Sequence, residues 1–263
     1  MCDAALWWGR IGWGSLGNHN SMNEWNDIAV IAPTTDIDLA SVPRLREQVD
    51  ALIDSGVRRI LVNCQNVTFI DSTGLAFLLS RARALYGREG LLSLVNASPD
   101  VARFLQIARL IDILHVSTVE RPAIPVIAPD VPPLWSKSFT IQRGVEHLAE
   151  YRHRVAELLG TLPLTREECF DVALAAGEAL SNAYDHACGG EGGSISVYAY
   201  PNRVIIEVRD CGCGYEIADG EEPAESLERG RGIKLMRMLV DSVEVRRRAD
   251  APGTQVRLIK LVG

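Results

Sequence analysis

The sequence predicts two domains of different architecture, an α/β domain in the first half of the chain and an α+β domain in the second. Three observations predict this division. Strand-like and helix-like segments alternate as far as residue 116, which is typical of a sheet with helices packed on it. Residues 117–136 contain five prolines and no helical period, which is typical of a semi-rigid linker. Beyond them, two helical segments precede a hairpin, as expected for helices over a mostly antiparallel sheet.

The first 23 residues differ from both domains. They are rich in Trp and Gly, and they lack the basic start and long apolar centre of a signal peptide. We expect residues 1–23 to be a disordered or non-native extension, and Met1 and Met22 both remain open as the natural start. No apolar run approaches the roughly 20 residues that span a bilayer, so we expect no membrane segment.

The first predicted domain, residues 24–116, alternates three strands with three helices. Apolar residues recur at helical spacing after the first strand and stop at Gly56. A short strand and an apolar-periodic segment then follow each other twice more. The expected strands are 28–33, 58–65 and 91–97, and the expected helices are 39–56, 72–85 and 99–114.

The second predicted domain, residues 137–263, begins with two helices. The second of them opens with Thr165 and Glu168 in the spacing of a capping box. A hairpin that turns at Pro201 and Asn202 follows, and a short helix and two more strands complete the domain. The expected helices are 145–160, 165–187 and 233–240, and the expected strands are the hairpin 195–210, then 242–248 and 254–262.

Glu178, Asn182 and His186 form the first cluster with chemical interest, because their spacing of four residues places them on one face of a helix. Taken alone, such a stripe is more often the polar face of an amphipathic helix. In a functional site, the carboxylate could orient or deprotonate a nucleophile, and the amide oxygen could hold a hard cation such as Mg²⁺.

The second cluster is DCGCG, residues 210–214. Asp210 ends a strand, where a carboxylate can accept a hydrogen bond from the amino group of a base. Gly212 and Gly214 let the backbone pass close to a planar ligand. Zinc at Cys211 and Cys213 is disfavoured, because no second Cys/His pair with suitable spacing occurs. A glycine-rich loop without a ligand remains an open alternative.

The third cluster, ERGRGIKLM, places Gly230 and Gly232 before a helix with Arg229 and Arg231 beside them. Backbone N–H groups and the dipole at a helix N-terminus favour phosphate, although a lone GxG is weak support. The sequence contains no Walker A loop. The acidic stretch before this cluster suits a mobile lid and equally an ordinary solvated loop.

Together the three clusters resemble the N, G1 and G2 boxes of the GHKL ATPase family, and Gly253-Thr254 resembles its terminal G-T. Within that family, the compact size and LERGRGIKLM resemble the anti-sigma factor serine kinases. The resemblance implies a Bergerat-type α+β sandwich over residues 137–263 that binds ATP and Mg²⁺.

The resemblance also implies roles: Glu178 as general base, Asn182 as Mg²⁺ ligand and Asp210 as adenine reader. Arg229 would act on the phosphates, but the G2 segment is one residue shorter than usual, which leaves Arg229 and Arg231 as alternatives. The other residues implied in the nucleotide pocket are His186, Gly212, Gly214, Gly230, Gly232 and Thr254.

The segment FIDSTGL, residues 69–75, resembles the STAS domain of anti-sigma factor antagonists, with TDIDLAS as a looser match in which Thr35 replaces a glycine. The resemblance implies that Ser72 is a phosphoacceptor, with Thr73 as a neighbour that could be modified instead. From its position after a strand and at a helix start, Ser72 is also expected to cap that helix, which would stabilise it by about 1 kcal/mol. Phosphorylation would add about −1.5 to −2 charges beside Asp71.

These observations predict a partner-switching transcription regulator that joins a STAS antagonist domain to a serine/threonine protein kinase. Its expected partners are its own or another STAS domain, a sigma factor and a second copy in a homodimer. The alternative is a non-catalytic ATP-binding adaptor. The net charge of −7 argues against direct nucleic-acid binding, and six scattered cysteines favour a reduced, cytoplasmic setting.

Overall fold

The computed structural model describes most of both predicted domains. The predicted extension over residues 1–23 and most of the acidic stretch, residues 218–227, lie outside the described residues. Within the described ranges, no helix combines the length and the apolar character needed to cross a bilayer. The chain divides between Arg121 and Pro122 into two compact units. The described residues are 28–118, 123–128, 130–141, 146–186, 193–217 and 228–262, with the backbone alone in 146–149, 185–186 and 228–231.

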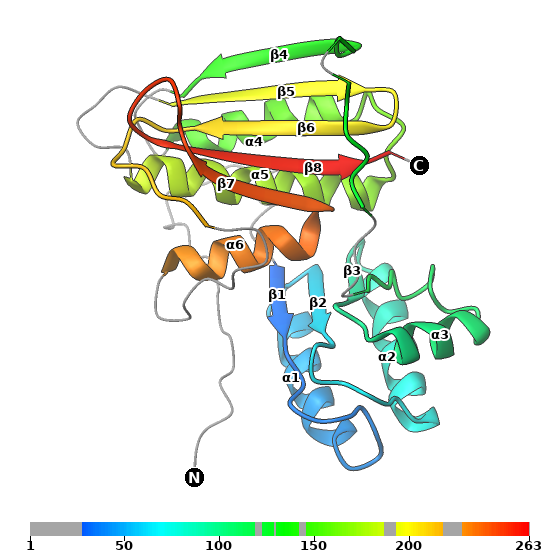
Figure 1. Cartoon of the computed structure of the whole chain (residues 1–263). Helices are drawn as coiled ribbons and strands as arrows, with labels where there is room; N and C mark the ends of the chain where they lie inside the picture. Colours follow the sequence, from blue (N-terminus) through cyan, green and yellow to red (C-terminus); the bar gives the residue numbers. More distant parts are fainter. Residues whose placement is uncertain are drawn as a thin grey trace. The chain divides into compact units, whose positions relative to one another are not determined.

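Unit 1 is built on three parallel strands in the order β1-β2-β3 (Figure 1). Ile28 of β1 lies beside Arg59 of β2, which in turn lies beside Leu91 of β3. Parallel neighbours need a crossover connection, and α1 and α2 provide the two crossovers. The elements are β1 (Ile28–Ile31), α1 (Val42–Asp54), β2 (Arg59–Asn63), α2 (Ser72–Tyr86), β3 (Leu91–Val95) and α3 (Pro99–Ile107).

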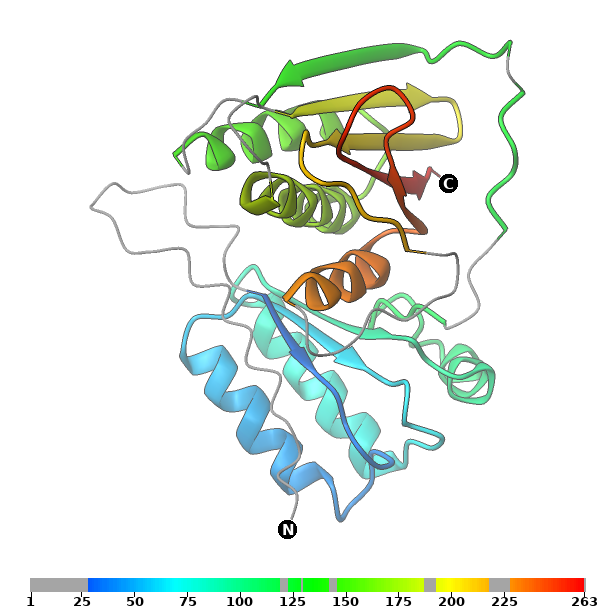
Figure 2. The same ribbon diagram turned by 60° about the vertical axis from the view of Figure 1, so that its left-hand side comes forward.

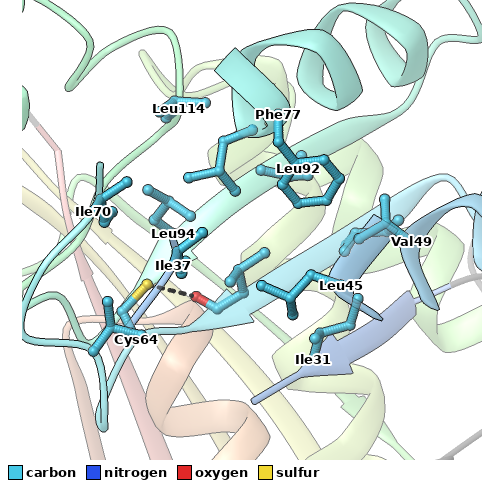
Figure 3. Packing of buried hydrophobic residues seen from close by; sticks show 14 of the residues in the cluster. Ile31, Ile37, Leu45, Val49, Cys64, Ile70, Phe77, Leu92, Leu94 and Leu114 are labelled. Atoms are coloured by element: carbon cyan, nitrogen blue, oxygen red, sulfur yellow. Dashed lines mark hydrogen bonds between the residues drawn. The ribbon is translucent and has the colours of Figure 1, made fainter. Parts of the chain in front are cut away.

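Aliphatic and aromatic side chains of the strands and helices form the core of unit 1. Figure 3 shows Leu45 of α1, Phe77 of α2 and Leu92 of β3 in this cluster. Cys64 lies in the same core, where its Sγ donates a hydrogen bond to the carbonyl oxygen of Val62 at 3.5 Å (Figure 3). Burial raises the pKa of the Cys64 thiol to about 12, so this cysteine packs as a small apolar residue.

The last helix of unit 1 is shorter than predicted, because α3 ends at Ile107 and not at residue 114. Arg109 adopts a φ of 57°, a left-handed conformation that a right-handed helix cannot contain. The turns that follow bring Leu114 back to the sheet, where its carbonyl oxygen accepts the N–H of Leu94 at 3.1 Å. The apolar spacing beyond Ile107 therefore reflects packing on β3 rather than a helix face.

Unit 2 contains a five-stranded antiparallel sheet in the order β4-β5-β6-β8-β7. Figures 1 and 2 show α5 on one face of this sheet, between α4 and α6. Alanines of α5, among them Ala176 and Ala179, are fully buried and allow the helix to approach its neighbours closely. The elements are β4 (Trp135–Thr140), α4 (Glu146–Leu159), α5 (Arg166–His186), β5 (Ser194–Tyr200), β6 (Arg203–Arg209), α6 (Glu228–Leu239), β7 (Ser242–Arg247) and β8 (Thr254–Leu261).

The edge strand β4 is an element that the sequence does not predict. Trp135 pairs with Ala199 and Thr140 pairs with Ser194, so β4 follows β5 along nearly its whole length. Its sequence WSKSFT is mostly polar and its side chains are exposed or half-buried, which leaves little hydrophobic signal. The predicted linker, residues 117–136, therefore includes the first two residues of β4.

Candidate functional site

Helix α5 carries the first group of candidate residues, and its start is fixed as the sequence predicts. The backbone N–H of Glu168 donates to the hydroxyl of Thr165 at 3.1 Å, and Glu168 Oε2 accepts the N–H of Thr165 at 2.9 Å. This reciprocal capping box sets where the helix begins. Farther along this helix, Glu178 and Asn182 are four residues apart and therefore lie about one turn apart on the same face.

Glu178 lies against α6 at Gly232. A Cβ at Gly232 would overlap the Glu178 carboxylate, so a larger residue there would force the Glu178 side chain to move. The structure therefore brings together two residues that are 54 positions apart in the sequence. Glycine at residue 232 has a steric role inside α6, which begins at Glu228 and not after the glycines as predicted.

Arg152 of α4 is a neighbour of Glu178 that sequence reasoning missed. Its Cδ atom lies 2.6 Å from the position that a Cβ on Gly177 would occupy, so α4 and α5 pack tightly at this point. Burial lowers the pKa of the Arg152 guanidinium, and the nearby charge of Glu178 opposes that shift. No motif marks Arg152, because only helix packing brings it to Glu178.

Asn182 presents a polar group without a partner. Its Nδ2 atom is buried, and no residue in the described part of the chain forms a hydrogen bond with it. A buried amide N–H is normally satisfied, so this donor suits an acceptor on a ligand, such as a phosphate oxygen. The oxygen of the same amide group is of the type that Mg²⁺ binds beside substrate phosphates.

Asp210 is the centre of the second group. It is only 5% exposed and follows β6, where this strand lies beside β8. Its Oδ1 atom accepts the N–H of Gly212 at 2.8 Å and the N–H of Thr254 at 2.9 Å. Among the described residues, no group donates to the second oxygen, Oδ2, which leaves an acceptor at the strand end.

Two glycines close the backbone around Asp210. Gly214 has a φ of 71°, and a Cβ there would lie 2.6 Å from the carbonyl oxygen of Gly253. Gly253 has a φ of 131°, and a Cβ there would overlap the carbonyl oxygen of Asp210. Both positions therefore require glycine for conformation and for space.

Arg248, which directly follows β7, also holds the backbone at Asp210 in place. Sequence analysis did not identify this residue. Its Nη1 donates to the carbonyl oxygen of Asp210 at 3.1 Å, while Nε and Nη2 bind the Asp250 carboxylate at 3.1 and 2.9 Å. The hydrogen bond from Arg248 lowers the pKa of Asp250 to about 2, so this pair stays charged in mildly acidic solution. Three consecutive arginines precede Asp250, and the sequence alone does not distinguish among them.

Some candidate side chains lie outside the described residues. The backbone of Arg229, Gly230 and Arg231 forms the first turn of α6, and His186 is the last residue of α5. Their side chains are not described, so their predicted roles stay predictions.

Ser72 is exposed at the first position of α2, and Thr73 beside it is half-buried. The N-cap of α2 is Asp71, whose Oδ1 accepts the N–H of Gly74 at 2.7 Å. The expectation that Ser72 caps the helix is therefore wrong. Because Asp71 has the extended backbone and the acceptor that an N-cap needs, it leaves the Ser72 hydroxyl available.

The turn that contains residues 36–41 is fixed beside Ser72. Asp36 Oδ1 accepts three hydrogen bonds, from the N–H and hydroxyl of Thr68 at 2.7 and 2.9 Å and from the N–H of Phe69 at 2.9 Å. The bond from the Thr68 backbone is the largest cause that lowers the pKa of Asp36. The N–H of Leu39 donates to Asp71 Oδ2 at 3.0 Å, so both oxygens of Asp71 are engaged.

Replacement of Asp71 by alanine should loosen the start of α2, because it removes both of these acceptors. We expect a local destabilisation of about 1 kcal/mol, seen as faster hydrogen–deuterium exchange of the first-turn amides. Asp71→Asn is the control, since asparagine keeps an oxygen for Gly74 and caps about as well as aspartate. Equal exchange in Asp71→Ala and wild type would contradict the assignment of the cap.

Comparison with known proteins gives matches to both halves. The family model of the STAS domain matches residues 21–123, and that of the histidine kinase-like ATPase domain matches residues 141–260. The anti-sigma-B factor antagonists of Staphylococcus aureus and Staphylococcus epidermidis are 33% and 30% identical over 82 residues, which is 31% of this chain and 76% of each relative.

Two solved structures are similar to parts of the chain. The unphosphorylated form of the anti-sigma factor antagonist SpoIIAA is 29% identical over 31% of this chain and 74% of its own, with a TM-score of 0.28. The RsbU and RsbW domains of Rv1364c from Mycobacterium tuberculosis are 19% identical over 49% of this chain and 32% of their own, with a TM-score of 0.35. The predicted pair of folds, an α/β STAS-like unit and an α+β unit of the GHKL type, is confirmed by the family matches and the sheet topologies.

Proposed function

This chain belongs to the family of STAS-domain anti-sigma factor antagonists and joins its STAS domain to a histidine kinase-like ATPase domain, and we propose that it is a partner-switching transcription regulator. Its second unit would be a protein serine kinase, and Ser72 would be its phosphoacceptor. The observation that carries the proposal is the exposed Ser72 in a chain that also places Glu178, Asn182 and Asp210 in an ATPase fold.

Each group of the second unit has a definite task in this proposal. Asp210 Oδ2 would accept a hydrogen bond from the adenine amino group, while Gly212 and Thr254 hold the carboxylate in place through Oδ1. Glu178 would take the proton of the acceptor hydroxyl. As the bond from the serine oxygen to the γ-phosphorus forms, the bond from that phosphorus to the bridging β-oxygen breaks, and ADP leaves.

Asn182 is the residue that would hold Mg²⁺, through its amide oxygen. When bound, Mg²⁺ neutralises negative charge on the phosphates and so helps to stabilise the transferring group. Arg152 would orient the Glu178 carboxylate, because opposite charges in a partly buried site attract each other. Arg229 or Arg231 would complete the phosphate site.

The surface around Ser72 supports a role in partner exchange. Leu39 and Phe69 are 71% and 57% exposed, and their loops are hydrogen-bonded to each other beside Asp71. Phosphorylation of Ser72 would place about −1.5 to −2 charges next to this apolar surface and next to Asp71. A partner bound through Leu39 and Phe69 would then be repelled, which is the basis of a switch. The partner would be a sigma factor regulator that recognises a STAS domain.

Intact mass after incubation with ATP and Mg²⁺ tests this function. The wild type should gain one phosphoryl group, and Ser72→Ala should gain none. Ser80→Ala is the matched control, because Ser80 is also exposed on α2 and should leave the gain unchanged. Equal phosphorylation of Ser72→Ala and wild type would remove Ser72 as acceptor. A wild type that binds ATP without ever becoming phosphorylated would instead support the adaptor.

A further inference from the structure

The loop between Asp210 and Gly214 carries two cysteines that the proposed kinase mechanism does not use. Cys213 is exposed and Cys211 is half-buried, so small reagents in solution can reach them. Both belong to the backbone segment that places Gly212 N–H on Asp210. Any change in this segment therefore acts on the proposed nucleotide site.

Arg248 provides a fixed cation beside the first of these thiols. Its Nη1 lies 3.6 Å from Cys211 Sγ, and its position is held by two hydrogen bonds to Asp250 and one to the carbonyl oxygen of Asp210. This contact places a positive charge directly beside the sulfur of a cysteine that solvent can reach.

The other two described cysteines have the opposite environment. Burial raises the pKa of the Cys64 thiol to about 12. Burial and the charges of Glu168 and Glu167 raise the pKa of the Cys169 thiol. Both environments favour the unreactive thiol. Cys211 and Cys213 are reached by solvent and lie two residues apart, so they are the described pair suited to forming a disulfide.

The spacing of Cys211 and Cys213 permits a disulfide. Cα atoms two residues apart are separated by at most about 7 Å in a fully extended chain. The chain bends at Gly212 and Cys213, so this stretch is not fully extended, and disulfide bonds join Cα atoms up to about 6.8 Å apart. A bond across Gly212 would change the backbone that now donates to Asp210.

We propose that Cys211 and Cys213 form a peroxide-sensitive thiol pair whose disulfide prevents nucleotide binding. The inference rests on the proposed nucleotide site. The Cys211 thiolate attacks hydrogen peroxide: an S–O bond forms, the O–O bond breaks, and the departing oxygen leaves as water after protonation. The Cys213 thiol then attacks the sulfenic acid: the S–S bond forms, the S–O bond breaks, and a second water leaves. Two thiols are oxidised as one peroxide is reduced to two waters.

The adjacent contacts explain why the disulfide would weaken binding. Gly214 adopts a left-handed conformation and is packed against the carbonyl oxygen of Gly253. The N–H of Thr254 donates a hydrogen bond to Asp210 Oδ1. The loop has little room to adjust while it keeps these contacts. Ring closure therefore displaces the Gly212 N–H from Asp210 Oδ1, and the carboxylate loses its orientation.

The test uses the full chain, treated with hydrogen peroxide and then digested without reduction for peptide mass analysis. ATP binding is measured by calorimetry before oxidation, after oxidation and after dithiothreitol. We expect a Cys211–Cys213 disulfide in the wild type, at least about a tenfold loss of ATP affinity, and recovery on reduction. Cys213→Ser should keep its affinity after brief oxidation. Cys169→Ser is the matched thiol control and should behave as the wild type.

The outcomes separate this inference from the proposed function. Reduced wild type that fails to bind ATP contradicts the nucleotide site, while the peptide analysis still tests the thiol pair. Reduced protein that binds ATP but forms no 211–213 disulfide overturns the thiol pair. A disulfide that leaves ATP affinity unchanged overturns its regulatory effect. Arg248→Ala should also slow iodoacetamide labelling of Cys211 about tenfold, and an unchanged rate would exclude Arg248 as its activator.

Discussion

Glu178→Gln should lower the rate of phosphoryl transfer by roughly 10²- to 10⁴-fold while ATP remains bound. Glutamine has almost the same size as glutamate, so the contact with Gly232 is kept, but an amide cannot take the proton of the acceptor hydroxyl. The measurement is the rate of phosphate incorporation at saturating ATP, with ATP affinity determined separately by calorimetry.

Glu167→Gln is the matched control for this prediction. Glu167 lies in the first turn of the same helix and is half-buried, so its replacement changes the charge of α5 equally without reaching the site. Its transfer rate should equal that of the wild type. Transfer by Glu178→Gln at the wild-type rate would end the assignment of Glu178 as the base.

Asp210→Asn should weaken ATP binding by roughly 10- to 100-fold, because hydrogen bonds to a charged group contribute about 1.5–3 kcal/mol. Oδ1 is held by Gly212 and Thr254, so the new NH₂ group takes the place of Oδ2. That position then donates and cannot accept from the adenine amino group. Calorimetric titration with ATP and with GTP measures the effect, and the loss should be larger for ATP.

The control for Asp210 is Asp241→Asn. Asp241 also accepts a backbone N–H of β8, from Leu261 at 2.7 Å, but it does so at the other end of that strand. Its replacement should affect stability to a similar extent and leave ATP affinity unchanged. If the two variants weaken ATP binding equally, the effect is one of general stability and Asp210 does not read the base.

Several parts of the fold follow from local patterns in the sequence. The capping box at Thr165 and Glu168 and the hairpin turn at Pro201 and Asn202 are specified by neighbouring residues, and both were predicted correctly. The prediction from the sequence was wrong for elements that depend on a partner far away in the chain. The polar strand β4 exists because β5 offers it hydrogen bonds, and the segment after Ile107 packs on β3.

The sequence by itself determined the two domain types and the order of the three clusters, because helical period, turn residues and motif order are local properties. Only the tertiary structure decided which residues surround them. Asp71 caps α2 in place of Ser72, Gly232 lies against the Glu178 carboxylate, and Arg152 and Arg248 reach the site from other elements. Some of these contacts join segments that are far apart in the chain, and the helix cap depends on the backbone dihedrals of one residue. Contacts of both kinds leave no periodic signal in the sequence.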